Sequence, residues 1–508
     1  MPEVIQEGDP AAPDDLLPRR ELNRRVSSGV FFIGAWGAVN LLVGFGGNIV
    51  LARMLVPADF GLVAIGATLM IFATTLSDGG LGSGLIRRAA SPTRQELRAV
   101  LGLQLTLTGA LALLAAAIAS FFGSSGAVVA VMMCGLPLAA VQTPGKVVLS
   151  RALRFRVLTG VDAIGVLAYY GWAIAWVFAG AGVWALATGV VFRALASSCA
   201  MAMASRGTNL LPSYRGARSL WPVISFGIRF QGISVAGMLR EQGLNAGVAG
   251  LSGVGTLGLW TLAKRILEVP VLITEPLHRV TFPYMSHLQA AREDPAPVIE
   301  RGIRVTGTAA GVVLTGLAAA ASGLVPGVFG EQWRETAVAV QWVCGSLLVA
   351  APLAVVAVGF LYAVGEPSVV LRATVAHTLT LFAVAFPLLP FVGVNAIGAG
   401  SLAGAVVDAV ILGRAVASRS SARPFRLMAV PVCLGAPAAV AGWLVTHQLG
   451  EDFAAALVGG SFAAVLYAGA VFLFRRETLL ETGSLVLRSV RAGLGRDGAA
   501  AIPAGQPG

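Results

Sequence analysis

The segment FGIRFQGISVAGMLREQGLN, residues 226–245, lies inside an apolar stretch that is long enough to cross a membrane as a helix. It carries three charged residues, Arg229, Arg240 and Glu241. A charged side chain at the centre of a bilayer costs about 3 kcal/mol on insertion scales, so such residues almost always face the interior of a helix bundle or a water-filled cavity. The segment therefore predicts a bundle of membrane-spanning helices with charged residues in its interior.

The composition agrees with a membrane protein. Only 12% of the 508 residues are charged and 56% are hydrophobic, whereas soluble domains contain roughly 25% charged residues. We therefore predict an all-α, polytopic membrane protein rather than a soluble domain with an anchor. The formal net charge of +11 would suit a nucleic acid, but the basic residues are spread over short loops between apolar segments. That distribution is typical of membrane topology and argues against a nucleic-acid partner.

Fourteen apolar segments have the length of roughly 20 residues that a transmembrane helix needs. They are residues 26–51, 62–86, 99–122, 126–148, 158–180, 183–204, 220–249, 255–280, 303–327, 336–362, 369–391, 395–416, 427–448 and 453–474. The loops between these segments are too short to hold a soluble catalytic domain.

The distribution of positive charge supports this count. If the N-terminus is cytoplasmic, 29 of the 36 lysine and arginine residues fall on the cytoplasmic side, whereas the outer loops hold only Arg53 and Arg334. Cytoplasmic loops of membrane proteins carry an excess of lysine and arginine. A missed span would invert every later loop and destroy this asymmetry. We therefore predict fourteen spans in the inner (cytoplasmic) membrane, with both termini cytoplasmic.

A weak internal repeat indicates two lobes. At an offset of 197 residues, ADFGLVAIGATL (58–69) aligns with GTLGLWTLAKRI (255–266), and Asn48 aligns with Asn245. Both copies start on the same side of the membrane, as in parallel repeats related by an axis along the membrane normal. A chance alignment of Gly- and Leu-rich sequence is the alternative. The predicted parts are a disordered cytoplasmic tail (1–23), an N-terminal lobe of spans 1–6 (24–204), a C-terminal lobe of spans 7–12 (219–416), two appended spans (427–476) and a cytoplasmic tail, either amphipathic or frayed (477–508).

Five basic residues lie within the predicted spans, all in spans 6, 7 and 8. They are Arg193, Arg229, Arg240, Lys264 and Arg265. Arg229 and Arg240 are eleven residues apart, about three helical turns, and therefore share a face. Such residues predict a hydrated, cationic cavity for an anionic group, above all phosphate, which arginine binds in a bidentate fork. The alternative is structural: Lys264 pairs with Glu268 at i,i+4, and Arg229 reaches the cytoplasmic surface.

Four acidic residues are also embedded in spans, namely Asp78, Glu241, Glu268 and Asp408. Asp78 and Asp408 are candidates for a proton or cation site in ion coupling, or for structural partners near helix ends. The histidines share no short motif, and the four cysteines show no metal-ligand spacing. Neither a phosphate-cradling Gly-Lys loop nor a GxSxG motif occurs. We therefore predict no catalytic site, no metal and no cofactor.

Several stretches resemble a known family. VLARMLVPADFGLVAIGATLMIFATTLSDGGLGSGLIRR (50–88) is similar to the N-terminal signature of polysaccharide flippases, the Wzx-type exporters. RALRFRVLTGVDAIGV and GAGVWALATG (within 151–189) resemble the subgroup that includes colanic-acid and teichuronic-acid exporters. GTLGLWTLAKRILEVPVLITEPLHRVTFPYMSHLQ (255–289) and VFGEQWRETAVAVQW (328–342) resemble motifs of the second lobe. The resemblance covers roughly residues 24–476.

This resemblance implies the fold of the multidrug/oligosaccharidyl-lipid/polysaccharide exporter superfamily, with two lobes around a central cavity that opens alternately to either side. It implies a flippase that moves an undecaprenyl-pyrophosphate-linked oligosaccharide to the periplasmic leaflet for cell-surface polysaccharide biosynthesis. Family members often carry an Asp in an Asn-x-Asp pattern where this chain has Arg240, Glu241 and Asn245. A role of that acid in ion coupling is therefore either absent here or has moved to Glu241.

The candidate substrate-binding residues are Arg229, Arg240, Glu241, Lys264, Arg265 and Glu268. We expect the basic residues to hold the substrate's pyrophosphate and the two glutamates to limit the positive field of the empty cavity. The expected partners are the lipid-linked oligosaccharide, membrane lipids, and polysaccharide polymerase or export machinery. Two neighbouring functions stay open, a cation or drug antiporter of the same superfamily and a lipid II flippase. A membrane-bound polymerase, ligase or acyltransferase would need catalytic residues on a sizeable outer loop, whereas the outer loops predicted here are short and contain few reactive side chains.

Overall fold

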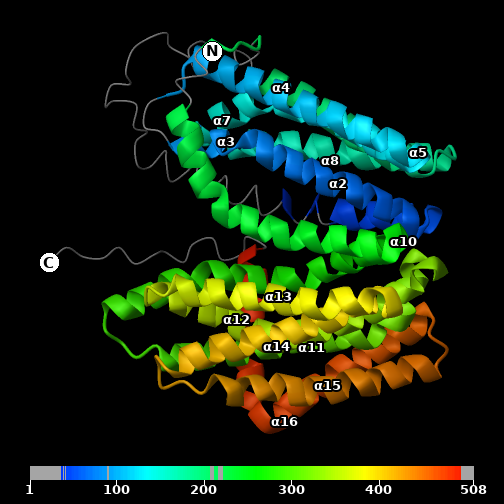
Figure 1. Cartoon of the computed structure of the whole chain (residues 1–508). Helices are drawn as coiled ribbons and strands as arrows, with labels where there is room; N and C mark the ends of the chain where they lie inside the picture. Colours follow the sequence, from blue (N-terminus) through cyan, green and yellow to red (C-terminus); the bar gives the residue numbers. More distant parts are fainter. Residues whose placement is uncertain are drawn as a thin grey trace. The chain divides into compact units, whose positions relative to one another are not determined.

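The structure is a computed structural model that describes residues 36–493, except 38, 41, 88–90, 206–210 and 216–220 (Figure 1). The described residues form helices joined by short loops and contain no strand. The chain divides into two compact units, residues 1–261 (unit 1) and 262–508 (unit 2). The prediction of an all-α polytopic fold is confirmed.

The helices of unit 1 precede residue 262. They are the helix Leu42–Met54, α2 (Pro57–Asp78), α3 (Leu81–Arg87), α4 (Arg94–Ala119), the 3₁₀ turn η2 (Ser120–Phe122), α5 (Gly123–Met133), α6 (Gly135–Ala140), α7 (Thr143–Arg151), α8 (Phe155–Phe178), α9 (Val183–Ala204) and the first part of α10 (Trp221–Ala290).

Unit 2 contains the rest of α10 and the helices that follow it. These are α11 (Ala296–Phe329), the 3₁₀ turn η4 (Glu331–Trp333), α12 (Arg334–Ala363), α13 (Pro367–Val392), α14 (Asn395–Ala417), α15 (Pro424–Gln448) and α16 (Phe453–Gly493). Figure 1 shows α11 to α16 lying side by side.

By length and composition, eleven helical stretches of the described chain could cross a membrane, and a shorter apolar helix spans Leu42–Met54. Two of the eleven each combine parts of two predicted spans. The stretch Arg94–Ala140 turns back at Gly123 (φ 59°), and Gly237–Pro270 contains Gly253 (φ 86°). Both glycines adopt backbone angles that side chains disfavour. With these two stretches divided, the structure agrees with the predicted count of about fourteen.

The predicted span 126–148 differs from the others because the structure breaks it into α5, α6 and α7. Pro137 and Pro144 explain the breaks. A proline lacks the N–H that would bond to the carbonyl four residues earlier, and its ring crowds that carbonyl. The interruptions accordingly fall at Cys134 and at 141–142. The broken helix still packs antiparallel to α4, because Val129 and Leu136 share a buried cluster with Leu111 and Ala115.

The helix α10 consists of two helices that meet at Gly253, where the backbone leaves the helical region. The helix before Gly253 packs on α2 through Gln242 and Asn245, which both bond to Thr68. The helix after Gly253 also begins against α2, because a Cβ at Gly61 would overlap the Val254 carbonyl and one at Gly258 would overlap the Pro57 carbonyl. The boundary between the two compact units falls later in α10, after Thr261. The helix before Gly253 is therefore grouped with unit 1, although the sequence pattern places it in the second predicted lobe.

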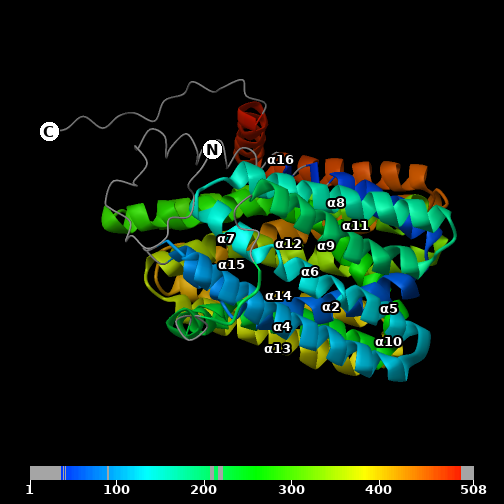
Figure 2. The same ribbon diagram turned by 90° about the horizontal axis from the view of Figure 1, so that it is seen from above.

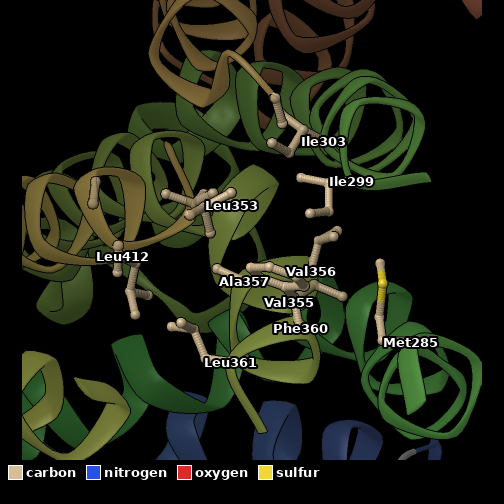
Figure 3. Close-up of a cluster of buried hydrophobic side chains, with 14 of the residues drawn as sticks. Met285, Ile299, Ile303, Leu353, Val355, Val356, Ala357, Phe360, Leu361 and Leu412 are labelled. Atoms are coloured by element: carbon tan, nitrogen blue, oxygen red, sulfur yellow. The ribbon is translucent and has the colours of Figure 1, made fainter. Parts of the chain in front are cut away.

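Unit 2 has a continuous apolar core at one end (Figure 3). Leu353, Val356 and Phe360 of α12 pack among Ile299 and Ile303 of α11, and all five are almost fully buried. Met285 of α10 and Leu412 of α14 complete the cluster.

Consecutive helices of unit 2 alternate in direction, so its loops gather at two ends. At one end the Ser421 hydroxyl donates to Asp294 over 3.4 Å, and the Arg423 N–H donates to Glu300 over 3.2 Å. Because most basic residues of unit 2 lie here, we call it the arginine-rich end. At the opposite, arginine-poor end, Arg334 contacts Glu451 over 2.7 Å.

Glycines allow the backbones of α11, α15 and α16 to approach one another directly. A Cβ at Gly442 would lie 2.5 Å from the Gly459 carbonyl oxygen, and one at Gly316 would lie 3.1 Å from that of Gly460. Thr446 adds a hydrogen bond from its hydroxyl to the Ala319 carbonyl over 3.1 Å. We call Gly316, Gly442, Gly459 and Gly460 the glycine seam. Small residues of this kind allow close helix packing in membranes, where apolar burial gives little driving force.

The last helix, α16, is interrupted at Arg475, whose φ of −151° and ψ of 55° are not helical. The chain before the break is apolar, and the helix resumes after it and continues to Gly493. Figure 2 shows the end of α16, in red, turning away from the direction of the rest of that helix.

Candidate functional site

The predicted site residues divide between the two units. Arg229, Arg240, Glu241 and Asp78 belong to unit 1, and Lys264, Arg265, Glu268 and Asp408 belong to unit 2. The backbone of Arg229 is helical, but its side chain lies outside the described residues. Their assembly around one substrate group therefore stays a prediction.

A buried polar cluster fixes how the first helix of α10 is turned. The Thr68 hydroxyl of α2 donates to Gln242 Oε1 over 2.8 Å, and Asn245 Nδ2 donates to Thr68 Oγ1 over 3.3 Å and to Gln242 Oε1 over 3.1 Å. Buried amides need such partners in an apolar environment. Because a helix turns about 100° per residue, residue 240 faces away from Gln242. Arg240 and Glu241 are accordingly exposed on the surface of unit 1.

In unit 2, the second helix of α10 carries the other predicted cations. Arg265 Nη1 contacts Glu268 Oε2 over 2.9 Å and Oε1 over 3.2 Å. Both side chains are partly exposed, and Lys264 is half-buried. Glu268 therefore already offsets one positive charge at this site.

Asp78 lies at the turn between α2 and α3 and is half-buried. Its Oδ1 accepts a hydrogen bond from the Gly82 N–H over 3.3 Å and another from Gln104 Nε2 over 3.4 Å. These contacts give the carboxylate a structural task at the helix junction. Asp408 is half-buried in the middle of α14.

An apolar pocket of about 1080 Å³ lies in unit 1 between α2, α4, α5 and α10. The described residues that line it include no charged side chain. Leu69 of α2, Leu111 of α4 and Leu239 of α10 mark three of its walls. Arg240, which is exposed and does not itself line the pocket, follows the pocket-lining Leu239 directly along α10.

The structure also contains a basic site that the sequence did not predict. A cavity of about 440 Å³ at the arginine-rich end of unit 2 is lined by residues of α11, α15 and α16 and by Arg423, which directly precedes α15. We call it the arginine pocket; its lining residues are Glu300, Arg304, Arg423, Arg426, Leu427 and Arg475. In the sequence these arginines served only to predict which loops are cytoplasmic. They are up to 171 positions apart along the chain, from Arg304 to Arg475, so nothing in the sequence indicates that they converge.

Two ion pairs close the loops of unit 2. Arg419 Nε donates to Glu366 over 2.7 Å, and this guanidinium holds the pKa of the Glu366 carboxyl below its usual value. The pKa of the Glu451 carboxyl lies below its usual value, mainly because of its hydrogen bond with His447 and to a smaller extent because of its hydrogen bond with Arg334. No group of three or more His, Cys, Asp or Glu residues that could hold a metal occurs in the described part of the chain.

The sequence is similar to proteins of polysaccharide biosynthesis. A family model described as "Polysaccharide biosynthesis protein" matches residues 50–338. The chain is 25% identical over 356 residues to the "Lipopolysaccharide biosynthesis protein WzxC" of Escherichia coli (strain K12), which covers 65% of this chain and 67% of that protein.

Two solved structures share the fold. The inward closed conformation of the lipid II flippase MurJ is similar with a TM-score of 0.65 and 9% identity, over 88% of this chain and 100% of that chain. An inward-facing MATE-family multidrug resistance transporter of the MOP superfamily is similar with a TM-score of 0.52 and 15% identity, over 77% of this chain and 98% of that chain. At these identities the likeness shows the fold alone.

Proposed function

Because the chain belongs to the family of polysaccharide biosynthesis proteins, we propose that it is a flippase for a polyprenyl-diphosphate-linked oligosaccharide. The family match confirms the resemblance found in residues 50–88 and 255–289, both of which lie within the matched range. The protein is a multi-pass membrane protein, and the substrate would move from the cytoplasmic to the outer leaflet of the inner membrane.

The observation that carries this proposal is the apolar pocket of unit 1 with Arg240 at its margin. A lipid-linked oligosaccharide has a long hydrocarbon tail, a diphosphate and a polar glycan. The uncharged pocket suits the tail, which gains nothing from polar contacts. Arg240, one residue beyond the pocket-lining Leu239, suits the diphosphate, because guanidinium–phosphate bonds are strong and directional. The alternative, a cation or drug antiporter, would be favoured by acidic residues in the cavity, and the described lining of this pocket contains none.

The other predicted cations act on the same group in this proposal. Lys264 and Arg265 contact the diphosphate during transport, and Arg229 receives it from the cytoplasmic side. Glu241 and Glu268 lower the positive potential when no substrate is bound; the Arg265–Glu268 pair supports this role. Several moderate charges suit a transporter better than one tight cage, because the substrate must also leave.

The hydrogen bonds of Asp78 support a structural role for this residue. We therefore assign ion coupling to Asp408 or Glu241. Both termini are cytoplasmic in this proposal, and polysaccharide polymerase or export machinery takes up the product. The chain moves its substrate without altering it chemically.

The test uses purified protein in proteoliposomes with a fluorescently labelled polyprenyl-diphosphate oligosaccharide and a membrane-impermeant quencher. We expect Arg240→Ala to slow translocation by about tenfold or more, because it removes a charged hydrogen bond worth roughly 1.5–3 kcal/mol. Lys264→Ala and Arg265→Ala should slow it to a smaller extent. Normal translocation by all three variants would contradict the role of these residues.

A matched pair of tryptophan variants tests the pocket. Leu111 lines the pocket, whereas Leu113 on the same helix does not line it and is 74% exposed. We expect Leu111→Trp to slow translocation by filling the pocket, and Leu113→Trp to leave it unchanged. Equal behaviour of the two variants would remove the pocket from the mechanism.

A further inference from the structure

The arginine pocket has an excess of positive charge that its own residues do not balance. Its lining contains four arginines and one carboxylate, Glu300, which gives a formal charge of +3. Glu300 Oε2 accepts a hydrogen bond from Arg304 Nη1 over 3.5 Å, and its Oε1 accepts the Arg423 backbone N–H over 3.2 Å. Each carboxylate oxygen therefore already accepts one hydrogen bond from another group of the pocket.

The remaining guanidinium groups are drawn together without an acceptor. Among the described residues, Arg426 and Arg475 have no hydrogen-bonded partner. Two cations, Arg304 and Arg426, and one anion, Glu300, lie within electrostatic range of Arg475. Like charges at such distances repel each other. This arrangement costs free energy in the empty protein, and a bound anion would remove that cost.

The position of the pocket along the helices indicates what kind of anion reaches it. Arg475 ends the apolar part of α16, and the three residues before it, Phe472, Leu473 and Phe474, are 42%, 81% and 74% exposed. Phe425, at the start of α15, is 44% exposed. Large apolar side chains with this exposure in a membrane protein contact lipid tails. The arginines therefore lie immediately beyond the hydrocarbon, where the phosphates of phospholipids are found.

We propose that Arg304, Arg423, Arg426 and Arg475 bind the phosphate of an anionic phospholipid headgroup, while the lipid's acyl chains lie along Phe472–Phe474 and Phe425. The shared chemistry is that of a phosphate, which a guanidinium can bind through two parallel hydrogen bonds. Basic pockets between helices at the cytoplasmic boundary are suited to such headgroups. The bound lipid would hold α15 and α16 together where the backbone of α16 breaks. The proposal does not depend on the transported substrate.

The experiment measures lipid binding to the purified full-length protein by native mass spectrometry. The probes are dioleoyl phosphatidylglycerol, dioleoyl phosphatidylcholine and inorganic phosphate. We expect tight binding of phosphatidylglycerol, weak binding of zwitterionic phosphatidylcholine, and no displacement of bound phosphatidylglycerol by inorganic phosphate. Displacement by inorganic phosphate would overturn the lipid assignment and make this a site for soluble phosphate.

A matched control separates the pocket from the general surface charge. The pocket variant is Arg426→Gln with Arg475→Gln. The control variant is Arg414→Gln with Arg372→Gln, which removes the same charge from exposed arginines that do not line the pocket. We expect the pocket variant to weaken phosphatidylglycerol binding by about tenfold or more, and the control by less than about twofold, as for an exposed charge. Equal losses in both variants would overturn the site.

A conservative variant guards against misfolding. Arg426→Lys with Arg475→Lys keeps both charges but loses the bidentate geometry. We expect intermediate binding, with an elution profile on gel filtration like that of the unmodified protein. Wild-type binding by the lysine variant would show that the pocket acts only as a diffuse charge and would overturn the headgroup geometry proposed here.

Discussion

The two ends of unit 2 handle positive charge in opposite ways. At the arginine-poor end, Arg334 donates from Nε and Nη2 to the two oxygens of Glu331 over 2.9 and 3.1 Å, and from Nη1 to Glu451 over 2.7 Å. One cation there has two anions. At the arginine-rich end, four arginines of the arginine pocket share the single carboxylate of Glu300.

The difference shows that these charges serve two purposes. The positive charge of Arg334 is balanced within the protein, because its Nε, Nη1 and Nη2 atoms all donate to carboxylates. Its contact with Glu451 ties down the loop between α15 and α16. The arginine pocket is incomplete within the described protein and acquires its balance from outside. Topology alone requires only that positive charge be abundant on one side; it does not require arginines from three helices to converge.

The largest effect concerns packing, which should not differ between the ends. Phe360 lies in the core at the arginine-rich end and Trp333 lies at the arginine-poor end, and both are 0% exposed. We expect Phe360→Ala and Trp333→Ala each to lower the free energy of unfolding by about 2–3 kcal/mol. This is below the ~3–5 kcal/mol that the same substitution costs in a soluble protein. In a membrane the substitution removes packing contacts, but little of the hydrophobic free energy that water supplies in a soluble core.

Thermal unfolding in neutral detergent measures this effect, and Phe391→Ala is the control because Phe391 is 84% exposed. A loss confined to one of the two buried positions would mean that the ends differ in packing as well as in charge.

The second effect should differ in sign between the ends. We expect Arg334→Gln to destabilise the protein by about 1 kcal/mol, since Glu331 loses its cation, Glu451 keeps only His447, and these side chains are partly exposed. We expect Arg426→Gln to leave stability unchanged or to raise it, because it relieves repulsion in the empty arginine pocket. The melting temperatures are compared in detergent without anionic lipid, at low and high salt. Destabilisation by both variants would end the contrast between the two ends.

The smallest effect is a dependence on pH. The pKa of Glu451 lies below its usual value of 4.5 because of His447 and Arg334, so its charged form is favoured in the folded state. A lowered carboxyl pKa gives stability that is present above the unfolded value and is lost as the pH falls through the folded value. We expect Glu451→Gln to lower the melting temperature at pH 7 and to make no difference well below pH 4.5.

The Glu366–Arg419 pair provides the matching measurement at the arginine-rich end, because the pKa of Glu366 is lowered in the same direction. Glu366→Gln should show the same loss of effect in acid. A Glu451→Gln effect that persists unchanged in acid would show that the contact is not ionic.

The sequence predicted the helices well and their breaks less well. Long apolar runs and the asymmetry of arginine give the number of spans, because both follow from the bilayer itself. The break of α5–α7 at Pro137 and Pro144 was readable in principle from the missing N–H groups. The break in α16 at Arg475 was not, since arginine has no local tendency to interrupt a helix.

The substrate site remains a prediction that rests on residue type. The embedded cations Arg240 and Arg265 were identified because a charge in an apolar run stands out. The arginine pocket was missed because each of its arginines lies at the end of an apolar run, where basic residues are ordinary. Only the folding of α11, α15 and α16 against one another brings them together.

The glycine seam of α11, α15 and α16 also restricts which substitutions can be accepted there during evolution. In most cores, a larger residue on one side can be accepted when its neighbour becomes smaller. Here an added Cβ at Gly442 or Gly316 would meet alanine side chains and also the carbonyl oxygens of Gly459 and Gly460, and no exchange of side chains removes a carbonyl. An added methyl group therefore has no compensating exchange across the seam. These four positions should stay glycine among descendants of this protein even where the glycan, the lipid and the surrounding loops have all changed.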